Sequence, residues 1–297
     1  MRGCIKNDVT SESYVSSKKD IAEYYDYTTP FYKYFWHRST GAVHYGLKET
    51  HTRGLADELL NTNVVLARLV KINSKDKILD AGCGVGGSSI WIAKRFGASV
   101  TGNSLSNEQV KKAKENAKQQ NVSDKTKFML MDYQRTTFKT ASFDIVWAIE
   151  SVCHAKPKSA FVNEAYRVLG SGGRLVIADG FLNRDPKSER ERRWLQEFCT
   201  GLCLPDIVGT NDFAELLRQR GFRKITVVDK TEAAYPSSRR LFWMCLFGYP
   251  LAILLETCRI TPKLLTRNNK AGIVQYTLVK SGVIGYKVFL AEKPYKK

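Results

Sequence analysis

The chain has 297 residues, a hydrophobic content of 43% and a formal net charge of +18 at pH 7. This length allows one large domain, or one domain with a substantial insertion. No stretch reaches the ~20 apolar residues of a membrane-spanning helix, and the polar start MRGCIKNDVTSESY lacks the apolar core of a signal peptide. Seven scattered cysteines without a C-x-x-C pair predict free thiols in a reducing compartment, and four histidines without ligand spacing predict no metal site. The positive charge raises nucleic acid or an anionic membrane as partners.

The N-terminal part is expected to be helical. Residues 1–20 are polar and are expected to be loose, whereas residues 24–36 contain eight aromatic residues in 13 positions. A core helix would also need aliphatic residues. We therefore favour a helix and loop that cap a ligand pocket with rings, which attract cations. Tyr45 follows in a turn, and residues 52–70 have the periodicity of a helix.

The stretch 77–96 predicts a nucleotide-binding corner. Residues 77–80 form a short apolar strand that ends in Asp80, four glycines follow between 82 and 87, and residues 88–96 form a helix. Glycines let the backbone turn sharply and let a ligand approach bare main chain. The spacing G-x-G-x-x-G through Gly82, Gly84 and Gly87 is weak evidence by itself.

Two residues choose between the ligands that such a corner binds. The Asp80 carboxylate, just before the glycines, would repel a pyrophosphate but suits a cationic amino-acid ligand. A NAD site requires an acid at the end of the next strand to hold the ribose, but that strand, residues 98–103, ends in Asn103. S-adenosylmethionine (SAM) therefore fits better than NAD.

Further strands are expected at residues 127–131, 143–149 and 174–178, with a turn at 170–173. A helix follows the second strand, and Ser106 and Gln109 predict a capping box at its start. The alternation of strands and helices predicts a parallel sheet with helices on both faces. Ligands bind at the carboxyl ends of the strands in such sheets, and four of those ends carry polar residues: Asp80, Asn103, Asp132 and Glu150.

The regular alternation stops after the fifth strand. An inserted helix is expected at 187–201, a helix between 210 and Gly221, a sixth strand at 223–229 and a seventh at 285–292. The insert between the last two strands contains 15 residues without a charge, 241–255, interrupted by Gly248 and Pro250. This run is too short and too broken to span a bilayer. It is expected to form a helical lid, which either folds onto the core or dips into a membrane interface beside Arg239, Arg240, Arg259 and Lys263.

These motifs resemble class I SAM-dependent methyltransferases, and within them the sterol C-methyltransferase and tocopherol methyltransferase branch. The resemblance rests on DAGCGVGGSS, AKRFGASVTG, LSNEQ, AIESVCHA, LPDIVGTNDFAELL and the aromatic stretch YYDYTTPFYKYFW, and it covers about residues 20–230. It implies a Rossmann-like fold with a seven-stranded, mostly parallel sheet, helices on both faces, an aromatic N-terminal helical cap and a C-terminal helical lid. Asn103, Ser171 and the segment 34–37 depart from the pattern of the branch.

The resemblance also implies roles. Gly82, Cys83 and Gly84 would present backbone to the methionine part of SAM, with Asp80 ordering the loop. Asn103 and Ser104 would bond the ribose with Gln109 nearby, Asp132 would accept from the adenine, and Tyr133 would lie beside the ring. The full expected cofactor set adds two rings of the N-terminal part and one residue under the methyl group: Tyr25, Tyr45 and Ile149.

The proton that leaves the acceptor requires a base. Glu150 and His154, four residues apart after the fourth strand, are the candidates. His154 is as readily explained by a structural hydrogen bond to the backbone.

The sequence therefore predicts a SAM-dependent methyltransferase for a small hydrophobic acceptor. An isoprenoid lipid such as a sterol, a terpene or a prenylated phenol is favoured, methylated on carbon or oxygen. The alternatives are a methyltransferase of nucleic acid or of another small metabolite, and a non-catalytic SAM- or lipid-binding protein. A nucleic-acid enzyme is not favoured, because methyltransferases of base amines usually carry a proline-containing motif after the fourth strand, where this chain has Ile149-Glu-Ser-Val.

The expected organisation is a loose N-terminus (1–20), a helical cap (21–75), a SAM-binding core (76–229) with a short insertion around 187–208, a hydrophobic and basic lid (230–282), and a final strand and tail (283–297). The expected location is cytoplasmic, with peripheral contact to an anionic membrane. The oligomeric state is left open.

Overall fold

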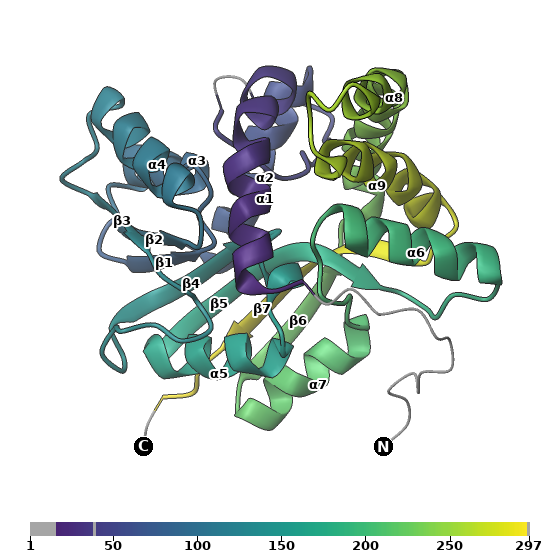
Figure 1. Ribbon diagram of the computed structural model, residues 1–297. Helices are drawn as coiled ribbons and strands as arrows, with labels where there is room; N and C mark the ends of the chain where they lie inside the picture. The colour runs from purple at the N-terminus through teal and green to yellow at the C-terminus, as the bar shows by residue number, and fades with distance from the viewer. Residues whose placement is uncertain (1–15, 38–39, 296–297) are drawn as a thin grey trace.

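The computed structural model describes residues 16–37 and 40–295. Residues 1–15, which make up most of the expected loose N-terminus, lie outside the described residues. The described chain forms one seven-stranded sheet in the order β3-β2-β1-β4-β5-β7-β6, in which only β7 runs antiparallel to its neighbours (Figure 1). The strands are β1 (Lys77–Ala81), β2 (Ser99–Ser104), β3 (Thr126–Leu130), β4 (Phe143–Ile149), β5 (Leu169–Leu182), β6 (Arg223–Asp229) and β7 (Ile284–Glu292). The expected fold class is confirmed.

Alternating strand residues supply two cores, one on each face of the sheet. On one face, Leu79 and Val146 pack with Phe161 of α5 (Lys158–Val168) and Phe213 of α7 (Thr210–Arg220). On the other face, Ile78, Ile145 and Trp147 pack against α2 (Leu55–Val70), and α3 (Gly87–Phe96) and α4 (Asn107–Gln119) continue this layer over β2 and β3. Strands buried on both faces read as continuous apolar runs, as 143–149 does.

One expected turn is part of a strand. Residues 170–173 belong to β5, and the pairing of β5 with β4 shifts there, from Phe143 opposite Leu169 to Ile145 opposite Arg174. Gly172 has a φ of +74°, a left-handed conformation that glycine adopts without cost. The glycines therefore make an irregularity within the strand instead of ending it.

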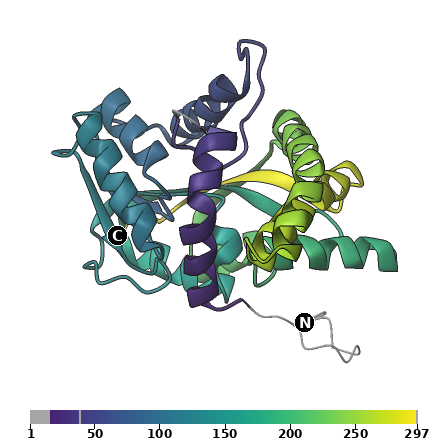
Figure 2. The same ribbon diagram turned by 45° about the horizontal axis from the view of Figure 1, so that its top comes forward.

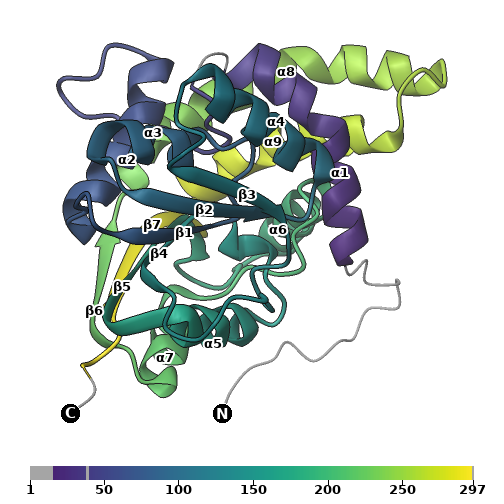
Figure 3. The same ribbon diagram turned by 90° about the vertical axis from the view of Figure 1, so that its left-hand side faces the viewer.

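The N-terminal helix α1 (Lys18–Tyr32) begins three residues earlier than expected, because Ser17 and Asp20 form a capping box. A π-helical segment, η1 (Lys33–His37), continues it. In Figures 1 and 2, α1 lies between the α3–α4 pair and the C-terminal helices. Figure 3 shows α1 beyond the ends of the strands and not over a face of the sheet.

Three helices lie on the other side of α1 from the α3–α4 pair in Figure 1: α6 (Glu189–Gly201), α8 (Thr231–Thr257) and α9 (Lys263–Lys280). The expectation of an interrupted apolar run is wrong, because α8 is one helix of 27 residues with Pro236 and Pro250 inside it. By length and composition alone, α8 is the one helix of the described chain that is apolar enough to cross a membrane. In Figure 3, α8 and α9 form a hairpin that extends away from α5 and α7.

Candidate active site

Two adjoining cavities lie at the carboxyl ends of the strands. The smaller, about 530 Å³ counted to its open mouth, borders the glycine turn and is called the glycine-loop cavity. The larger, about 970 Å³ counted in the same way, lies below α1 and α9 and is called the aromatic cavity. Four residues line both cavities and form their shared wall: Tyr25, Val43, Glu150 and His154.

The glycine turn presents bare backbone to the glycine-loop cavity. Gly82 and Gly84 both line it, with φ values of +88° and +53°. A Cβ added to Gly84 would meet only Gln109, at 4.0 Å, so the space above Gly84 is open to a ligand. A Cβ added to Gly82 would clash with the Ser151 side chain at 2.4 Å, so this glycine allows the loop to approach the end of β4.

Three residues that were expected at the cofactor instead support the glycine loop with their side chains. Asp80 is buried and accepts a 2.6 Å hydrogen bond from the hydroxyl of Ser89 in α3, and burial raises the pKa of its carboxyl to about 6. The Asn103 side chain is buried and accepts a 3.2 Å hydrogen bond from the Gly82 amide. The Cys83 thiol packs with Phe128 in a small core. The structure places the Asp80, Asn103 and Cys83 side chains around the loop and outside the lining of the cavity.

The opposite wall of the glycine-loop cavity comes from β2, α4 and the β3–β4 connection. Ser104, Gln109 and Tyr133 line it as expected. Ser106 caps α4, because its hydroxyl accepts a 3.0 Å hydrogen bond from the backbone N–H of Gln109. The side-chain oxygen of Gln109, however, accepts a 2.8 Å hydrogen bond from the Ser104 hydroxyl instead of bonding the backbone of Ser106. The expected reciprocal capping box is therefore wrong, because the Gln109 side chain is bound to a residue of the cavity wall.

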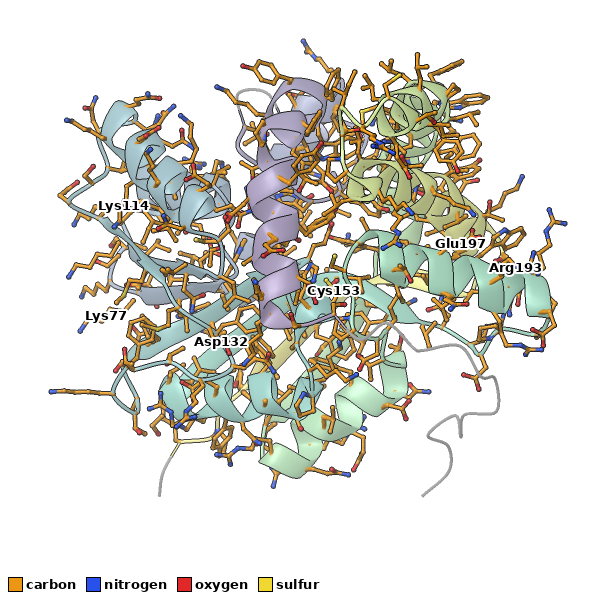
Figure 4. All side chains as sticks on the ribbon, in the orientation of Figure 1. Lys77, Lys114, Asp132, Cys153, Arg193 and Glu197 are labelled. Carbon is orange, nitrogen blue, oxygen red and sulfur yellow. The ribbon has the colours of Figure 1, made fainter. Side chains whose placement is uncertain are left out.

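The expected adenine partner is engaged elsewhere. The Asp132 carboxylate lies 2.5 Å from the Lys18 ammonium at the start of α1 and does not line either cavity. Figure 4 places Asp132 beside the lower end of α1. This ion pair fastens the N-terminal helix to the rim of the cofactor side.

Glu150 follows Ile149, the last residue of β4, and has a φ of +45°, which is unusual for a side chain of this size. Its Oε1 accepts hydrogen bonds from the Tyr45 amide at 2.6 Å and from the Tyr286 hydroxyl at 2.9 Å. Burial, reinforced by the nearby Asp179 carboxylate, raises the pKa of Glu150 to about 8 despite those two bonds. A carboxyl held in this way is poised to take or give a proton near neutral pH.

His154 is held between the wall and α1. Its Nδ1 donates to the Cys203 carbonyl at 3.3 Å, so in the neutral ring Nε2 accepts from the Tyr25 hydroxyl at 2.8 Å. Burial lowers the pKa of His154 to about 4, which keeps the ring neutral. His154 therefore both makes the structural hydrogen bond to the backbone and lies on the shared wall.

The aromatic cavity contains residues that the sequence did not reveal. Tyr45, expected at the cofactor, lines this cavity instead, and so do Asp179 and Tyr286. Asp179 lies two residues beyond Ile177 near the end of β5, so its position was available from the strand pattern. Tyr286 comes from β7, 136 residues after Glu150, and no local signal connects the two. Among the described residues, the lining contains no Lys or Arg and is mostly rings and aliphatic side chains: Tyr24, Tyr32, Trp36, Phe198, Leu202, Leu204, Ile207, Leu241, Val279 and Ile284 among them.

The lining of the glycine-loop cavity fits SAM in its chemistry. Open backbone above Gly84, the hydroxyl of Ser104 and the ring of Tyr133 would hold an amino-acid group, a ribose and an adenine, and the ring of Tyr25 would lie on the side of the methyl group. Within residues 16–37 and 40–295, no group of three or more His, Cys, Asp or Glu side chains could hold a metal ion.

The sequence of this chain is similar to those of known proteins. Residues 79–177 match the family described as a methyltransferase domain. A tocopherol O-methyltransferase from Arabidopsis thaliana is 28% identical over 94% of this chain and 86% of its own length, and a 27-O-demethylrifamycin SV methyltransferase from Amycolatopsis mediterranei (strain S699) is 30% identical over 66% of this chain and 71% of its own. Sterol C-methyltransferases are also among the relatives.

A solved structure shares the fold. The geranyl diphosphate C-methyltransferase from Streptomyces coelicolor A3(2), in complex with Mg²⁺, geranyl diphosphate and S-adenosyl-L-homocysteine, superposes with a TM-score of 0.72 at 20% identity, over 95% of this chain and all of that one. The expected cofactor and enzyme class are confirmed. The chain belongs to the class I SAM-dependent methyltransferases, with tocopherol and sterol methyltransferases among its relatives.

Proposed function

We propose that this methyltransferase acts on a small hydrophobic acceptor, an isoprenoid lipid such as a sterol, a terpene or a prenylated phenol, which it methylates on carbon or oxygen. The observation that carries the proposal is the shared wall. Tyr25, Glu150 and His154 border both cavities, so a methyl group at the end of the glycine-loop cavity faces the aromatic cavity across them.

The lining of the aromatic cavity supports a hydrophobic acceptor. Rings and aliphatic side chains surround it, and two of its polar groups, Glu150 and His154, lie on the wall shared with the glycine-loop cavity. Such a pocket binds an apolar body and orients one reactive end. The names of the relatives point the same way, since one acts on a tocopherol and the solved neighbour on geranyl diphosphate.

The residues of the wall divide the chemical work. SAM supplies an electrophilic methyl group, and the reaction needs an in-line approach and a dry site more than covalent help. Tyr25 and Val43 are part of the wall between the two cavities, so they would lie between SAM and the acceptor. Glu150 or His154 then takes the proton, either from an acceptor hydroxyl or from the carbocation that remains when a carbon is methylated.

We also propose that the enzyme works in the cytoplasm with peripheral contact to an anionic membrane. The six cysteines within the described ranges are free thiols, which supports a reducing compartment. A hydrophobic acceptor resides in bilayers, so contact with their surface brings the enzyme to its substrate.

The test is transfer from SAM with an isotopically heavy methyl group to a total lipid extract, followed by mass spectrometry. We expect the heavy methyl group in one or a few isoprenoid lipids. Incorporation into added RNA or DNA instead would favour a nucleic-acid methyltransferase, and SAM binding without transfer to any acceptor would favour a binding protein. A parallel reaction with Gly84→Val, which should not bind SAM, separates enzymatic transfer from background methylation.

A further inference from the structure

The outer face of α8 is unusually apolar. Phe247 is 76% exposed, Leu251 and Leu254 are each 58% exposed and Trp243 is 50% exposed. These four residues lie at intervals of four, four and three, which places them on one stripe of the helix. Leu246 and Ile253 extend the stripe. A water-facing helix normally has charged and polar residues on its outer face, so α8 has the opposite pattern.

The inner face of α8 carries the smaller residues. Cys245 and Ala252 are buried, and a Cβ added to Gly272 of α9 would meet the Cys245 sulfur at 2.2 Å. Arg240 forms a two-pronged ion pair with the buried Glu58 of α2. The close packing and this ion pair hold α8 against α9 and α2 by its inner face. The large apolar side chains on the opposite face therefore stay exposed.

Three aromatic residues extend this face onto the N-terminal cap. Tyr34 and Phe35 of η1 are 67% and 64% exposed, and Phe31 is 37% exposed. Between them and α8, the buried Trp36 packs with Leu241. We call the whole the apolar cap surface, and it comprises Phe31, Tyr34, Phe35, Trp243, Leu246, Phe247, Leu251, Ile253 and Leu254. In Figure 1 the upper end of α1 and the helix α8 stand on the same end of the molecule.

Basic residues flank the apolar cap surface. Lys33, Arg239, Arg259 and Lys263 are exposed, and none forms an ion pair within residues 16–37 and 40–295. The last 68 residues of the sequence contain 12 Lys and Arg against three Glu, in a chain of net charge +18. Arg240, expected from the sequence to face a membrane, is instead held by Glu58. The arrangement of apolar centre and cationic edge is complementary to an anionic lipid surface.

The same elements connect this surface to the aromatic cavity. Tyr32, Trp36 and Leu241 line the cavity, and the segments that carry them, α1–η1 and α8, present the exposed rings on their outer side. A lipid that leaves a bilayer at the apolar cap surface therefore meets the same two segments that line the cavity.

We propose that the apolar cap surface docks into the headgroup region of an anionic bilayer, with α8 lying in the plane of the membrane, and that the acceptor enters the aromatic cavity from there. Docking stands on the surface alone, whereas the entry route rests on the proposed function. A spanning orientation of α8 is disfavoured, because the buried Arg240–Glu58 pair and the tight contact with α9 would have to break.

The experiment is co-sedimentation of the full chain with vesicles of phosphatidylcholine and phosphatidylglycerol, and with vesicles of phosphatidylcholine alone. Each basic residue near an anionic surface contributes about 1 kcal/mol, and the attraction fades over a Debye length of ~8 Å. We expect the wild type to sediment with the anionic vesicles at low salt, to be released as salt rises, and to bind the neutral vesicles at least ten-fold more weakly.

Three variants identify the surface. Trp243→Ser with Phe247→Ser keeps the charge and should reduce binding at least ten-fold. Arg239→Glu with Arg259→Glu and Lys263→Glu should also reduce it. The matched control makes the same charge change on α4, with Lys111→Glu, Lys114→Glu and Lys118→Glu, on the other side of α1 from α8 in Figure 1, and should retain most of the binding.

Several outcomes would overturn the proposal. These are a wild type that stays in the supernatant with anionic vesicles at low salt, equal losses for the α4 control and the α8 charge variant, and a wild-type dimer in ultracentrifugation that Trp243→Ser with Phe247→Ser dissociates. SAM affinity, measured by calorimetry, should be unchanged in every variant. If vesicles bind but no isoprenoid lipid is methylated, the docking surface stands and the proposed acceptor class fails.

Discussion

The Tyr25 hydroxyl donates to Nε2 of His154 at 2.8 Å, across 129 residues of sequence. Tyr25 comes from α1, and His154 comes from the short helix after β4. Burial raises the pKa of Tyr25 well above its usual range and lowers the pKa of His154 to about 4, so both groups are neutral and the proton lies on the tyrosine. The bond joins two residues of the shared wall and ties the N-terminal cap to the wall of the aromatic cavity.

Tyr25→Phe should therefore lower kcat by roughly 10-fold to 100-fold while SAM affinity stays within a few-fold, because the ring remains but the bond that positions the wall is lost. Tyr27→Phe on the same helix is the matched control, since its ring packs on Phe31 and lines neither cavity, and it should behave as wild type. Steady-state kinetics and calorimetry give both quantities. Equal activity of Tyr25→Phe and Tyr27→Phe would show that the hydroxyl has no role.

The dependence of kcat/KM on pH distinguishes the two candidate bases. A carboxylate takes a proton only when it is ionised, and the pKa of Glu150 is raised to about 8. With Glu150 as the base, kcat/KM should rise about ten-fold for each unit of pH below 8 and level off above it. His154 is already neutral above about pH 5, so as the base it would give a flat profile from pH 6 to 9.

The variants complete this test. We expect Glu150→Gln to lose the slope and at least about 100-fold in kcat, the scale of general-base catalysis, and His154→Ala to keep the slope. A wild-type profile that is flat from pH 6 to 9 and that His154→Ala alone abolishes would assign the base to His154.

Gly84→Val should block SAM binding, because the added side chain fills the open space in which ligand meets backbone. The substitution also strains a backbone at φ +53°. Gly282→Val is the control for that strain, since Gly282 has φ +72° and nothing lies within 4 Å of its added Cβ. Calorimetry should give no SAM binding for Gly84→Val and normal binding for Gly282→Val. Normal SAM affinity in both variants would remove the glycine turn from the cofactor site.

The glycine turn and the strand ends were predictable because they are local. Asp80 and Glu150 end apolar runs, and parallel strands bring their carboxyl ends to one edge. The hydrogen-bond and ion-pair partners of the polar residues at these strand ends were not predictable. Asn103 was expected at the ribose but bonds Gly82, and Asp132 was expected at the adenine but pairs with Lys18. Asn103 ends the expected second strand and Asp132 follows the expected third strand, but which neighbour each one meets depends on side chains brought in by other elements.

The continuity of α8 was also not predictable from the sequence. Gly248 and Pro250 predicted a break in the apolar run, but packing against α9 keeps the helix continuous. The sequence likewise gave no sign that Arg240 would meet Glu58, 182 residues earlier in the chain. Contacts of this range arise only when the lid docks on the cap.

Arg240→Ala should destabilise the fold, because it leaves the Glu58 carboxylate buried without its partner. Loss of one member of a buried pair typically costs about 3–5 kcal/mol, and the 40% exposure of Arg240 places the expected loss at the low end. Arg239→Ala, one residue away and exposed, should leave the melting temperature unchanged. Thermal unfolding compares the two variants, and equal melting temperatures would mean that the Arg240–Glu58 pair does not hold α8 to α2.

The central claim is that a methyl group crosses from the glycine-loop cavity to an acceptor in the aromatic cavity. Its most direct test is Ile207→Trp, which fills the aromatic cavity from a loop that does not line the glycine-loop cavity. Heavy-methyl transfer to the lipid extract, measured by mass spectrometry alongside SAM affinity, should fall at least ten-fold in this variant while SAM still binds as tightly as to wild type. Full transfer by Ile207→Trp at normal SAM affinity would contradict the claim.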